Sequence, residues 1–233
     1  AILPLLVTAS RARKGAKAFA GLYAANTLGA VIGSLGVGFV LLPVCGTRLT
    51  GLILVMLLIG LGLVLLASEP EARRIVVIAF GTCVLLHFSH NVPRELYEVR
   101  IGPDSRILEF REGVESNVMV TDDATMRKLW IGSIWVAGTG GPHEAFGHIP
   151  GLLVDEPKRV LGIALGTGQT FAAVFKHGVE HFDCVEIDAN VVQLSRKWFR
   201  EANGGLLDDP RVSTHIEDGR SFMRQSNATY DMI

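Results

Sequence analysis

The stretch that decides the fold of the C-terminal half is residues 159–219, RVLGIALGTGQTFAAVFKHGVEHFDCVEIDANVVQLSRKWFREANGGLLDDPRVSTHIEDG. It opens on a continuous apolar run, which is typical of a strand buried on both faces of a parallel sheet. A glycine turn, a helical stretch, a second strand, an amphipathic helix and a third strand follow in that order. The predicted bounds are Arg159–Leu165 and His181–Ile187 for the first two strands, Ala189–Glu201 for the helix and Arg211–Ile216 for the third strand. This alternation predicts a doubly wound, Rossmann-like α/β domain.

Glycines and carboxylates gather where these strands are predicted to end. Gly166-Thr167-Gly168 follows the first strand, and small residues there let the backbone approach a ligand. Glu186 lies near the end of the second strand, 18 residues after Gly168. In doubly wound folds an acid about 20 residues after the turn accepts hydrogen bonds from ribose hydroxyls. Asp218 follows the third strand at the same edge, where it could accept from an amine such as that of adenine, cap the next helix, or do both. We therefore predict a nucleoside site at this edge.

The N-terminal part has a different composition. Residues 1–93 hold seven Lys/Arg and two Asp/Glu, whereas residues 94–233 hold 15 and 21. Ala18–Thr47 and Leu49–Ser68 carry no charged residue, and about 20 apolar residues suffice to span a bilayer. Pro43–Arg48 suits a turn between them, and Ile75–Pro93 is either a marginal third span or a helix in the interface. We predict a transmembrane helical region whose partner is the lipid membrane, with no nucleic-acid partner, because the basic residues flank apolar runs.

The side of the membrane on which the C-terminal half lies depends on the third run. The basic residues before the first span (Arg11, Arg13, Lys14, Lys17) place that loop in the cytoplasm by the positive-inside rule. If Ile75–Pro93 spans the bilayer, the C-terminal half faces outward; if it does not, that half is cytoplasmic. A nucleoside made in the cytosol favours the cytoplasmic side.

The middle of the chain forms a third region. Ile107–Val136 alternates apolar and polar residues and predicts a small antiparallel β-hairpin module, and His143–Leu153 fits a short helix. We expect three parts: a transmembrane helical region at 1–93, the hairpin module with its linking helix at 94–153, and the N-terminal half of the Rossmann-like nucleoside-binding domain at 154–233. The chain starts without Met and stops in a strand that begins at Tyr230, so we expect a fragment of a longer protein. Three well-separated cysteines suggest neither a metal site nor a disulfide framework.

Residues Val160–Ile233 resemble the spermidine synthase family of aminopropyltransferases, whose fold is of the S-adenosylmethionine methyltransferase type. The resemblance is carried by Val185-Glu186-Ile187-Asp188, Asn203-Gly204-Gly205, Leu207-Asp208-Asp209-Pro210-Arg211, Glu217-Asp218-Gly219 and Tyr230-Asp231. The hairpin module and His143-Glu144…His148-Ile149-Pro150 resemble the N-terminal part of the family. The first spans resemble the membrane region of bacterial proteins in which a spermidine-synthase-like domain follows several helices, through residues 22–29, Gly38-Phe39 and Leu42-Pro43.

The resemblance implies roles for individual residues. Glu186 would hold the ribose of decarboxylated S-adenosylmethionine or methylthioadenosine, Asp218 the adenine, and His143 would lie near the nucleoside, which Gly166, Thr167 and Gly168 would also contact. It implies a small amine acceptor, no permanently bound cofactor and no metal, and a catalytic acid located after Ile233. The chain departs from the family in three places: Thr167 replaces an Asp, Pro142 replaces a Tyr, and an apolar residue near Val136 replaces a Gln.

Three functions remain open at this point. The first is a multi-pass protein of the bacterial inner membrane, with its soluble domain in the cytoplasm, that transfers an aminopropyl group from decarboxylated S-adenosylmethionine to a polyamine; this fragment alone would be inactive. The second is an S-adenosylmethionine-dependent methyltransferase, since the neutral Thr167 leaves room for the carboxylate of that cosubstrate. The third is a non-catalytic transporter or sensor with a nucleoside-binding domain.

Overall fold

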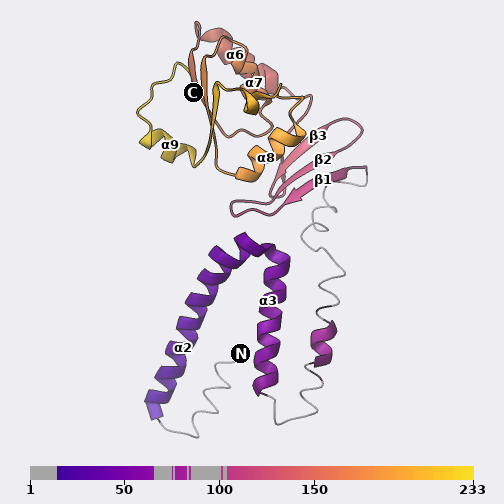
Figure 1. The fold of residues 1–233 in the computed structure, drawn as a ribbon, viewed down its shortest axis with the longest axis vertical. Helices are drawn as coiled ribbons and strands as arrows, with labels where there is room; N and C mark the ends of the chain where they lie inside the picture. The colour runs from indigo at the N-terminus through magenta and orange to yellow at the C-terminus, as the bar shows by residue number, and fades with distance from the viewer. Residues whose placement is uncertain (1–14, 66–74, 76, 83, 85–100, 102–103) are drawn as a thin grey trace. The chain divides into compact units, whose positions relative to one another are not determined.

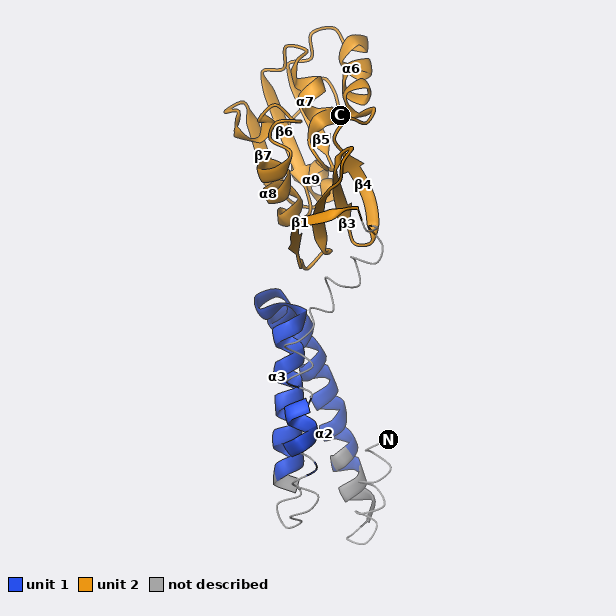
Figure 2. Ribbon diagram, turned by 90° about the vertical axis from the view of Figure 1, so that its right-hand side faces the viewer, with its two compact units in different colours: residues 1–89 blue, residues 90–233 orange. Residues whose placement is uncertain are grey.

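The computed structural model describes residues 15–65, 75, 77–82, 84, 101 and 104–233. The chain divides into two compact units, residues 1–89 and residues 90–233 (Figure 2). The predicted boundary at residue 93 lies outside the described residues, as do Arg11, Arg13, Lys14 and most of the third apolar run. Within that run, residues 75, 77–82 and 84 are helical.

The N-terminal unit consists of helices in its described part. Helix α2 spans Gly15–Gly36, a π-helical turn spans Val37–Leu41, and α3 spans Leu42–Leu65. The chain reverses direction between α2 and α3 (Figure 1). Only Gly46, with φ 71° and ψ 173°, leaves the helical conformation. The predicted turn at Pro43–Arg48 is therefore reduced to a single glycine, which adopts a positive φ at no steric cost.

Much of the surface of these helices is apolar. Large side chains such as Leu28, Ile32, Phe39, Leu57 and Leu58 are exposed. A continuous stretch, Tyr23–Leu63, has a mean hydropathy of 2.2 and is long and apolar enough to cross a membrane. One such stretch does not by itself establish a multi-pass membrane protein, because core helices and signal sequences share the same length and composition.

The second unit begins with a four-stranded antiparallel sheet. Its strands β1 (Arg106–Arg111), β2 (Val118–Asp122), β3 (Arg127–Ile131) and β4 (Ile134–Gly138) pair in chain order. They occupy the region expected to form a hairpin module. A tight turn at Gly132, with φ 60°, divides the run of residues 127–138 into two strands.

The rest of this unit alternates helices and parallel strands. The elements are α6 (His143–Leu153), β5 (Arg159–Ile163), α7 (Gln169–Phe175), β6 (His181–Glu186), α8 (Ala189–Trp198), a 3₁₀ turn (Leu206–Asp208), β7 (Val212–Ile216) and α9 (Gly219–Gln225). The sheet order is β5-β6-β7, and a parallel bridge between Val160 and Met232 adds a further segment on the free side of β5. Parallel strands connected through helices in this way build the Rossmann-like sheet that the sequence predicted.

Helix α8 is buried on two sides and joins the two sheets. Val192 packs in the core between the parallel sheet and α7, together with Val160, Phe171, Val174, Phe182 and Cys184. Val191 and Leu194 pack in a second core, against Val118, Val120 and Leu129 of the antiparallel sheet. Through these apolar contacts α8 holds the antiparallel sheet beside the parallel one.

Glu109 on β1 adds a polar contact to this joint. Its carboxylate accepts hydrogen bonds from Lys197 Nζ (2.6 Å) and Trp198 Nε1 (2.7 Å) on α8, and from Arg111 Nε (2.8 Å). Burial raises the pKa of Glu109, but the hydrogen bonds from Lys197, Trp198 and Arg111 outweigh it and lower that pKa to about 2.

We expect Glu109→Gln to destabilise the second unit by about 1–2 kcal/mol at pH 7, because the ionised acceptor is lost. The folded-state pKa of Glu109 lies below its ordinary value of 4.5. The contribution is therefore complete above pH 4.5 and disappears as the pH falls toward 2. Urea unfolding can be followed by the three tryptophans, Trp130, Trp135 and Trp198, which all belong to this unit.

The matched control for this experiment is Glu180→Gln, which removes an exposed carboxylate paired with Lys158 at 3.2 Å. An exposed pair contributes less than about 1 kcal/mol, so this variant should unfold almost like the parent chain. Equal losses in the two variants would contradict the role given to Glu109.

Candidate functional site

The turn after β5 is held in a conformation that needs glycine. Gly166 and Gly168 have φ values of 56° and 81°, and a Cβ on Gly168 would lie 3.3 Å from Asn203 Cβ. Ala164 also has a positive φ, 68°, which ends β5 two residues earlier than predicted. A non-glycine residue in this region carries strain of about 1–3 kcal/mol and is typical of functional sites. Ala164 is a site feature that the sequence did not reveal.

Thr167 points into the protein and not toward the sheet edge. Its side chain is buried, and Thr167 Oγ1 accepts from Gln169 Nε2 at 2.9 Å. Gln169 Nε2 also donates to the carbonyl of Gly138 at the end of β4 (2.9 Å), and Asn203 Nδ2 donates to the carbonyl of Thr167 (3.1 Å). The turn is thus fixed between the antiparallel sheet and the loop after α8, and it offers a ligand mainly its backbone.

Glu186, the last residue of β6, holds the turn from the other side. It is only 6% exposed; Glu186 Oε2 accepts from the Leu165 amide (2.9 Å) and Oε1 from the Asp188 amide (3.1 Å). Glu186 is therefore not a solvated charge at a strand end. A carboxylate has about four acceptor positions, so each oxygen keeps one with which to accept from a hydroxyl.

Asp188 begins α8 beside Glu186. Its Oδ1 accepts from the Asn190 amide at 2.8 Å, which caps the helix. Asp188 is 6% exposed, and its Oδ2 has no hydrogen-bond partner among the described residues. The loop between β1 and β2 lies against this residue: a Cβ on Gly113 would be 3.5 Å from Asp188 Oδ2. Asp188 belongs to the motif that carries the resemblance, but the sequence did not single it out as a site residue or indicate its burial under that loop.

Asp218 lies at the start of α9 and caps it. Its Oδ1 accepts from the Ser221 amide at 2.9 Å, and this backbone hydrogen bond lowers the pKa of Asp218 below its ordinary value. The next residue, Gly219, packs so closely on the end of β5 that a Cβ there would lie 2.6 Å from Ile163 Cγ2. The capping alternative is therefore realised, and Asp218, which is exposed, remains within reach of solvent and ligands.

His143 lies at the first position of α6. Its carbonyl accepts from Thr170 Oγ1 in the first turn of α7 at 3.0 Å, and its ring meets Phe146 edge-on with centroids 6.5 Å apart. The structure therefore brings Gly166, Thr167, Gly168, Glu186 and Asp218 to the carboxyl ends of β5, β6 and β7. His143 is connected to α7, the helix that follows the turn, by the hydrogen bond from Thr170.

This edge combines negative charge with exposed apolar surface. Residues 164–168, 186–190 and 217–220 hold four carboxylates (Glu186, Asp188, Glu217, Asp218) and a single Lys or Arg, Arg220. At the strand ends Ile163, Ile187 and Ile216 are 36%, 47% and 51% exposed. Exposed isoleucines beside hydrogen-bond acceptors suit a ligand with a flat apolar part and several donors. The sequence did not single out these isoleucines.

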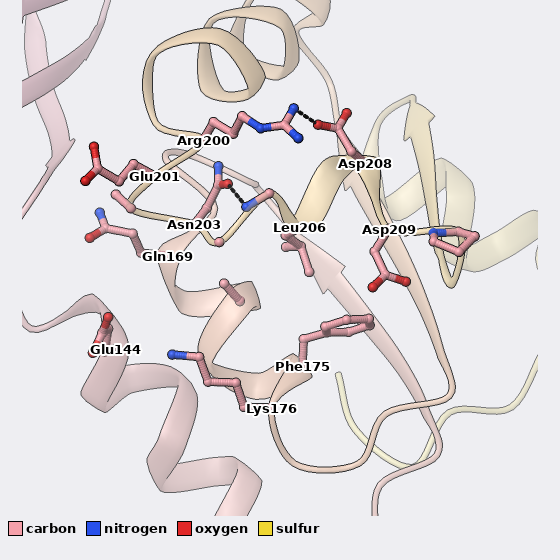
Figure 3. A pocket seen from close by; sticks show the side chains of 15 residues that line it. Glu144, Gln169, Phe175, Lys176, Arg200, Glu201, Asn203, Leu206, Asp208 and Asp209 are labelled. Atoms are coloured by element: carbon pink, nitrogen blue, oxygen red, sulfur yellow. Dashed lines mark hydrogen bonds and ion pairs between the residues drawn. The ribbon is translucent and has the colours of Figure 1, made fainter.

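A cavity of about 530 Å³ lies elsewhere, between α6, α7 and the loop of residues 200–210 (Figure 3). Figure 3 shows Glu144 and Lys176 on one side and Arg200, Asn203 and Asp208 on the other. Some of its polar groups already have partners, since Arg200 pairs with Asp208 and Asn203 Oδ1 accepts from the Gly205 amide (3.1 Å). We therefore place the candidate site at the carboxyl ends of the strands and not in this cavity.

The motifs at this edge are shared with known proteins. Residues 141–233 match the spermine/spermidine synthase domain. The polyamine aminopropyltransferase of Pectobacterium carotovorum subsp. carotovorum is 42% identical over 92 residues, which cover 39% of this chain and 32% of that protein. The resemblance predicted from the sequence motifs is confirmed.

Two further proteins are similar. The polyamine aminopropyltransferase of Ruegeria sp. is 32% identical over 149 residues, which cover 63% of this chain and 50% of that protein. Spermidine synthase from Thermotoga maritima, known from a crystal structure, has 26% sequence identity to this chain and a TM-score of 0.48. The match covers 52% of this chain and 44% of that one. The chain thus spans about a third to a half of the length of these curated relatives.

Removing Glu186 and removing Asp218 should lower the free energy of unfolding by different amounts. We expect Glu186→Ala to destabilise the second unit by about 2–4 kcal/mol, because two backbone N–H groups lose a charged, buried acceptor. Asp218→Ala, which removes an exposed helix cap, should lower the stability clearly less. Urea unfolding followed by tryptophan fluorescence measures both, and equal losses would contradict the structural role of Glu186.

Proposed function

We propose that the full-length protein is a membrane-bound spermidine synthase-like enzyme, which transfers an aminopropyl group from decarboxylated S-adenosylmethionine to a polyamine acceptor. The observation that carries this proposal is the acidic, partly apolar edge at the ends of β5, β6 and β7. The match of residues 141–233 to the spermine/spermidine synthase domain supports the same chemistry.

In this proposal each site residue has a role in binding. Glu186 accepts from the ribose hydroxyls through the acceptor positions that Leu165 and Asp188 leave open. Asp218 accepts from the amine of the adenine, the exposed isoleucines contact the base, and His143 lies beside the nucleoside. The Gly166-Thr167-Gly168 turn lets the backbone approach the cosubstrate.

The reaction is a displacement at carbon. The amine acceptor attacks the carbon next to the sulfonium, a C–N bond forms, the C–S bond breaks, and methylthioadenosine leaves. The proton lost by the amine goes to a carboxylate. The sulfonium supplies the reactivity, and the protein supplies orientation and negative charge.

The charge of the edge favours a cationic cosubstrate. Decarboxylated S-adenosylmethionine carries a sulfonium and an ammonium group, which are attracted by the carboxylates at the strand ends. S-adenosylmethionine carries an additional carboxylate, which would meet charges of the same sign. The buried Thr167 hydroxyl does not face the ligand, so it gives that carboxylate no donor. The methyltransferase alternative is therefore the weaker one.

The N-terminal unit supports membrane attachment. Exposed leucine, isoleucine and phenylalanine side chains around α2 and α3 are unfavourable in water and suit a lipid environment. We propose a location in the bacterial inner membrane, with the second unit on the cytosolic side, where the nucleoside is made.

We expect the full-length protein to bind decarboxylated S-adenosylmethionine at least about tenfold more tightly than S-adenosylmethionine, and to release methylthioadenosine when putrescine is added. Glu186→Gln should weaken methylthioadenosine binding by about 1.5–3 kcal/mol, the range for a hydrogen bond to a charged group. Calorimetry measures the affinities, and chromatography the product.

The matched control is Glu217→Gln, which removes the same charge from the same edge but does not touch the turn; Glu217 Oε1 accepts from Gln225 (3.3 Å). Equal weakening in both variants would mean that only net charge matters. If the protein binds S-adenosylmethionine more tightly and transfers its methyl group, the aminopropyltransferase proposal is wrong and the methyltransferase alternative is supported. Binding of a nucleoside without turnover would favour the transporter or sensor.

The intact chain should sediment with membranes, resist extraction by alkaline carbonate, and require detergent. The physical reason is the exposed apolar surface of Tyr23–Leu63. Fractionation followed by size-exclusion chromatography tests this. Recovery of a monodisperse chain in buffer without detergent would rule out membrane attachment.

A further inference from the structure

Asp183, in the middle of β6, is a buried carboxylate with four hydrogen-bond donors around it. It is 4% exposed. Its Oδ1 lies 2.9 Å from His215 Nε2 and 3.2 Å from His181 Nε2, and its Oδ2 accepts from Tyr230 Oη (2.9 Å) and an Arg159 guanidinium nitrogen (3.2 Å). Four donors fill the acceptor positions of one carboxylate. Although burial raises the pKa of Asp183, hydrogen bonds from His215, Tyr230 and His181 lower it below its ordinary value.

Tyr230 reaches this carboxylate across a neighbouring strand. The segment at residues 230–232 lies beside β5, on the side away from β6, because Met232 bridges Val160 and the sheet order is β5-β6-β7. The Tyr230 hydroxyl therefore passes under β5 to bond Asp183 on β6. The guanidinium carbon of Arg159 lies 5.4 Å from the centre of the Tyr230 ring, on this path.

Backbone contacts fix the same alignment. The Leu161 amide donates to the Met232 carbonyl (3.0 Å), and the Asp231 amide donates to the Arg159 carbonyl (2.9 Å). Asp231 Oδ2 accepts from the amides of Lys158 and Arg159, at 2.9 and 2.8 Å. These contacts hold the start of the segment at one register along β5.

A shift of this register would be costly. Moving the segment by one residue turns alternate side chains to the opposite face of the sheet. Tyr230 would then leave Asp183, and the buried carboxylate would lose one of its four donors. A buried polar group without its partner is strongly unfavourable, so the network selects a single alignment.

We propose that Asp183 and Tyr230 are positioning residues, which set the register of the segment at residues 230–232 against β5. In this register Met232 is opposite Val160, and Ile163 at the carboxyl edge is three residues further on. A strand that extends the segment at residues 230–232 in this alignment therefore ends at the edge that holds Glu186 and Asp218. The register rests on the geometry alone; its consequence for catalysis rests on the proposed function.

Tyr230→Phe in the full-length protein tests this, because it keeps the ring against Arg159 and removes only the hydroxyl. We expect hydrogen exchange at the Leu161 and Asp231 amides to become about tenfold faster. We also expect kcat for aminopropyl transfer to fall by about 10- to 100-fold, since small misplacements of reacting groups have effects of that size. The dissociation constant of methylthioadenosine should not change, because Tyr230 is not part of the nucleoside site.

A stability-matched variant separates positioning from general destabilisation. Val212→Ala removes apolar contact at the start of β7; Val212 packs on the core and supplies none of the four donors of Asp183. Its kcat should stay at the parent value when both variants are assayed well below their melting temperatures. Equal kcat losses in the two variants, or unchanged kcat in Tyr230→Phe, would overturn the catalytic consequence.

The exchange experiment also decides the case in which the proposed function fails. If the parent protein neither binds methylthioadenosine nor turns over, the aminopropyltransferase proposal is wrong. Faster exchange at Leu161 and Asp231 in Tyr230→Phe, but not in Val212→Ala, still supports the register. Exchange at the parent rate in Tyr230→Phe would overturn it.

Discussion

The hydrogen bonds of the Glu186 carboxylate to two backbone amides are the interaction on which the candidate site depends. One oxygen holds the turn after β5 through Leu165, and the other holds the start of α8 through Asp188. Because the side chain is buried and ionised acceptors are strong, this pair of bonds fixes two strand ends relative to each other. The same carboxylate keeps acceptor capacity for a ligand, so one group serves both the fold and the proposed binding of a ribose.

The antiparallel sheet completes the site because α8 and the turn both hold it. Glu109 and the apolar contacts of Val191 and Leu194 join it to α8, while Gln169 joins the end of β4 to the turn. The loop between β1 and β2 then covers Asp188. A ligand at the strand ends would therefore be bounded by elements that lie far apart in the sequence, and the rigidity of α8 sets their spacing.

Local patterns in the sequence predicted the elements well, whereas contacts between distant segments could not be read from it. Helix α6 has the predicted bounds, His143–Leu153, since apolar periodicity and turn residues act over a few positions. Strand β5 ends early because Ala164 takes a positive φ, which no propensity indicates. The inward side chain of Thr167 depends on Gln169, and its carbonyl is held by Asn203. The burial of Glu186 depends on Leu165 across the sheet. The four donors on Asp183 come together only through strand register.

The most direct test of this account is an experimental structure of the full-length protein with methylthioadenosine. The account predicts that the ribose hydroxyls lie about 2.6–3.2 Å from the Glu186 carboxylate oxygens, with the bonds to the Leu165 and Asp188 amides retained. It also predicts that the base rests against the isoleucines at the strand ends. A nucleoside bound in the cavity beside α7, with the Glu186 carboxylate touching only its two amides, would contradict the central claim.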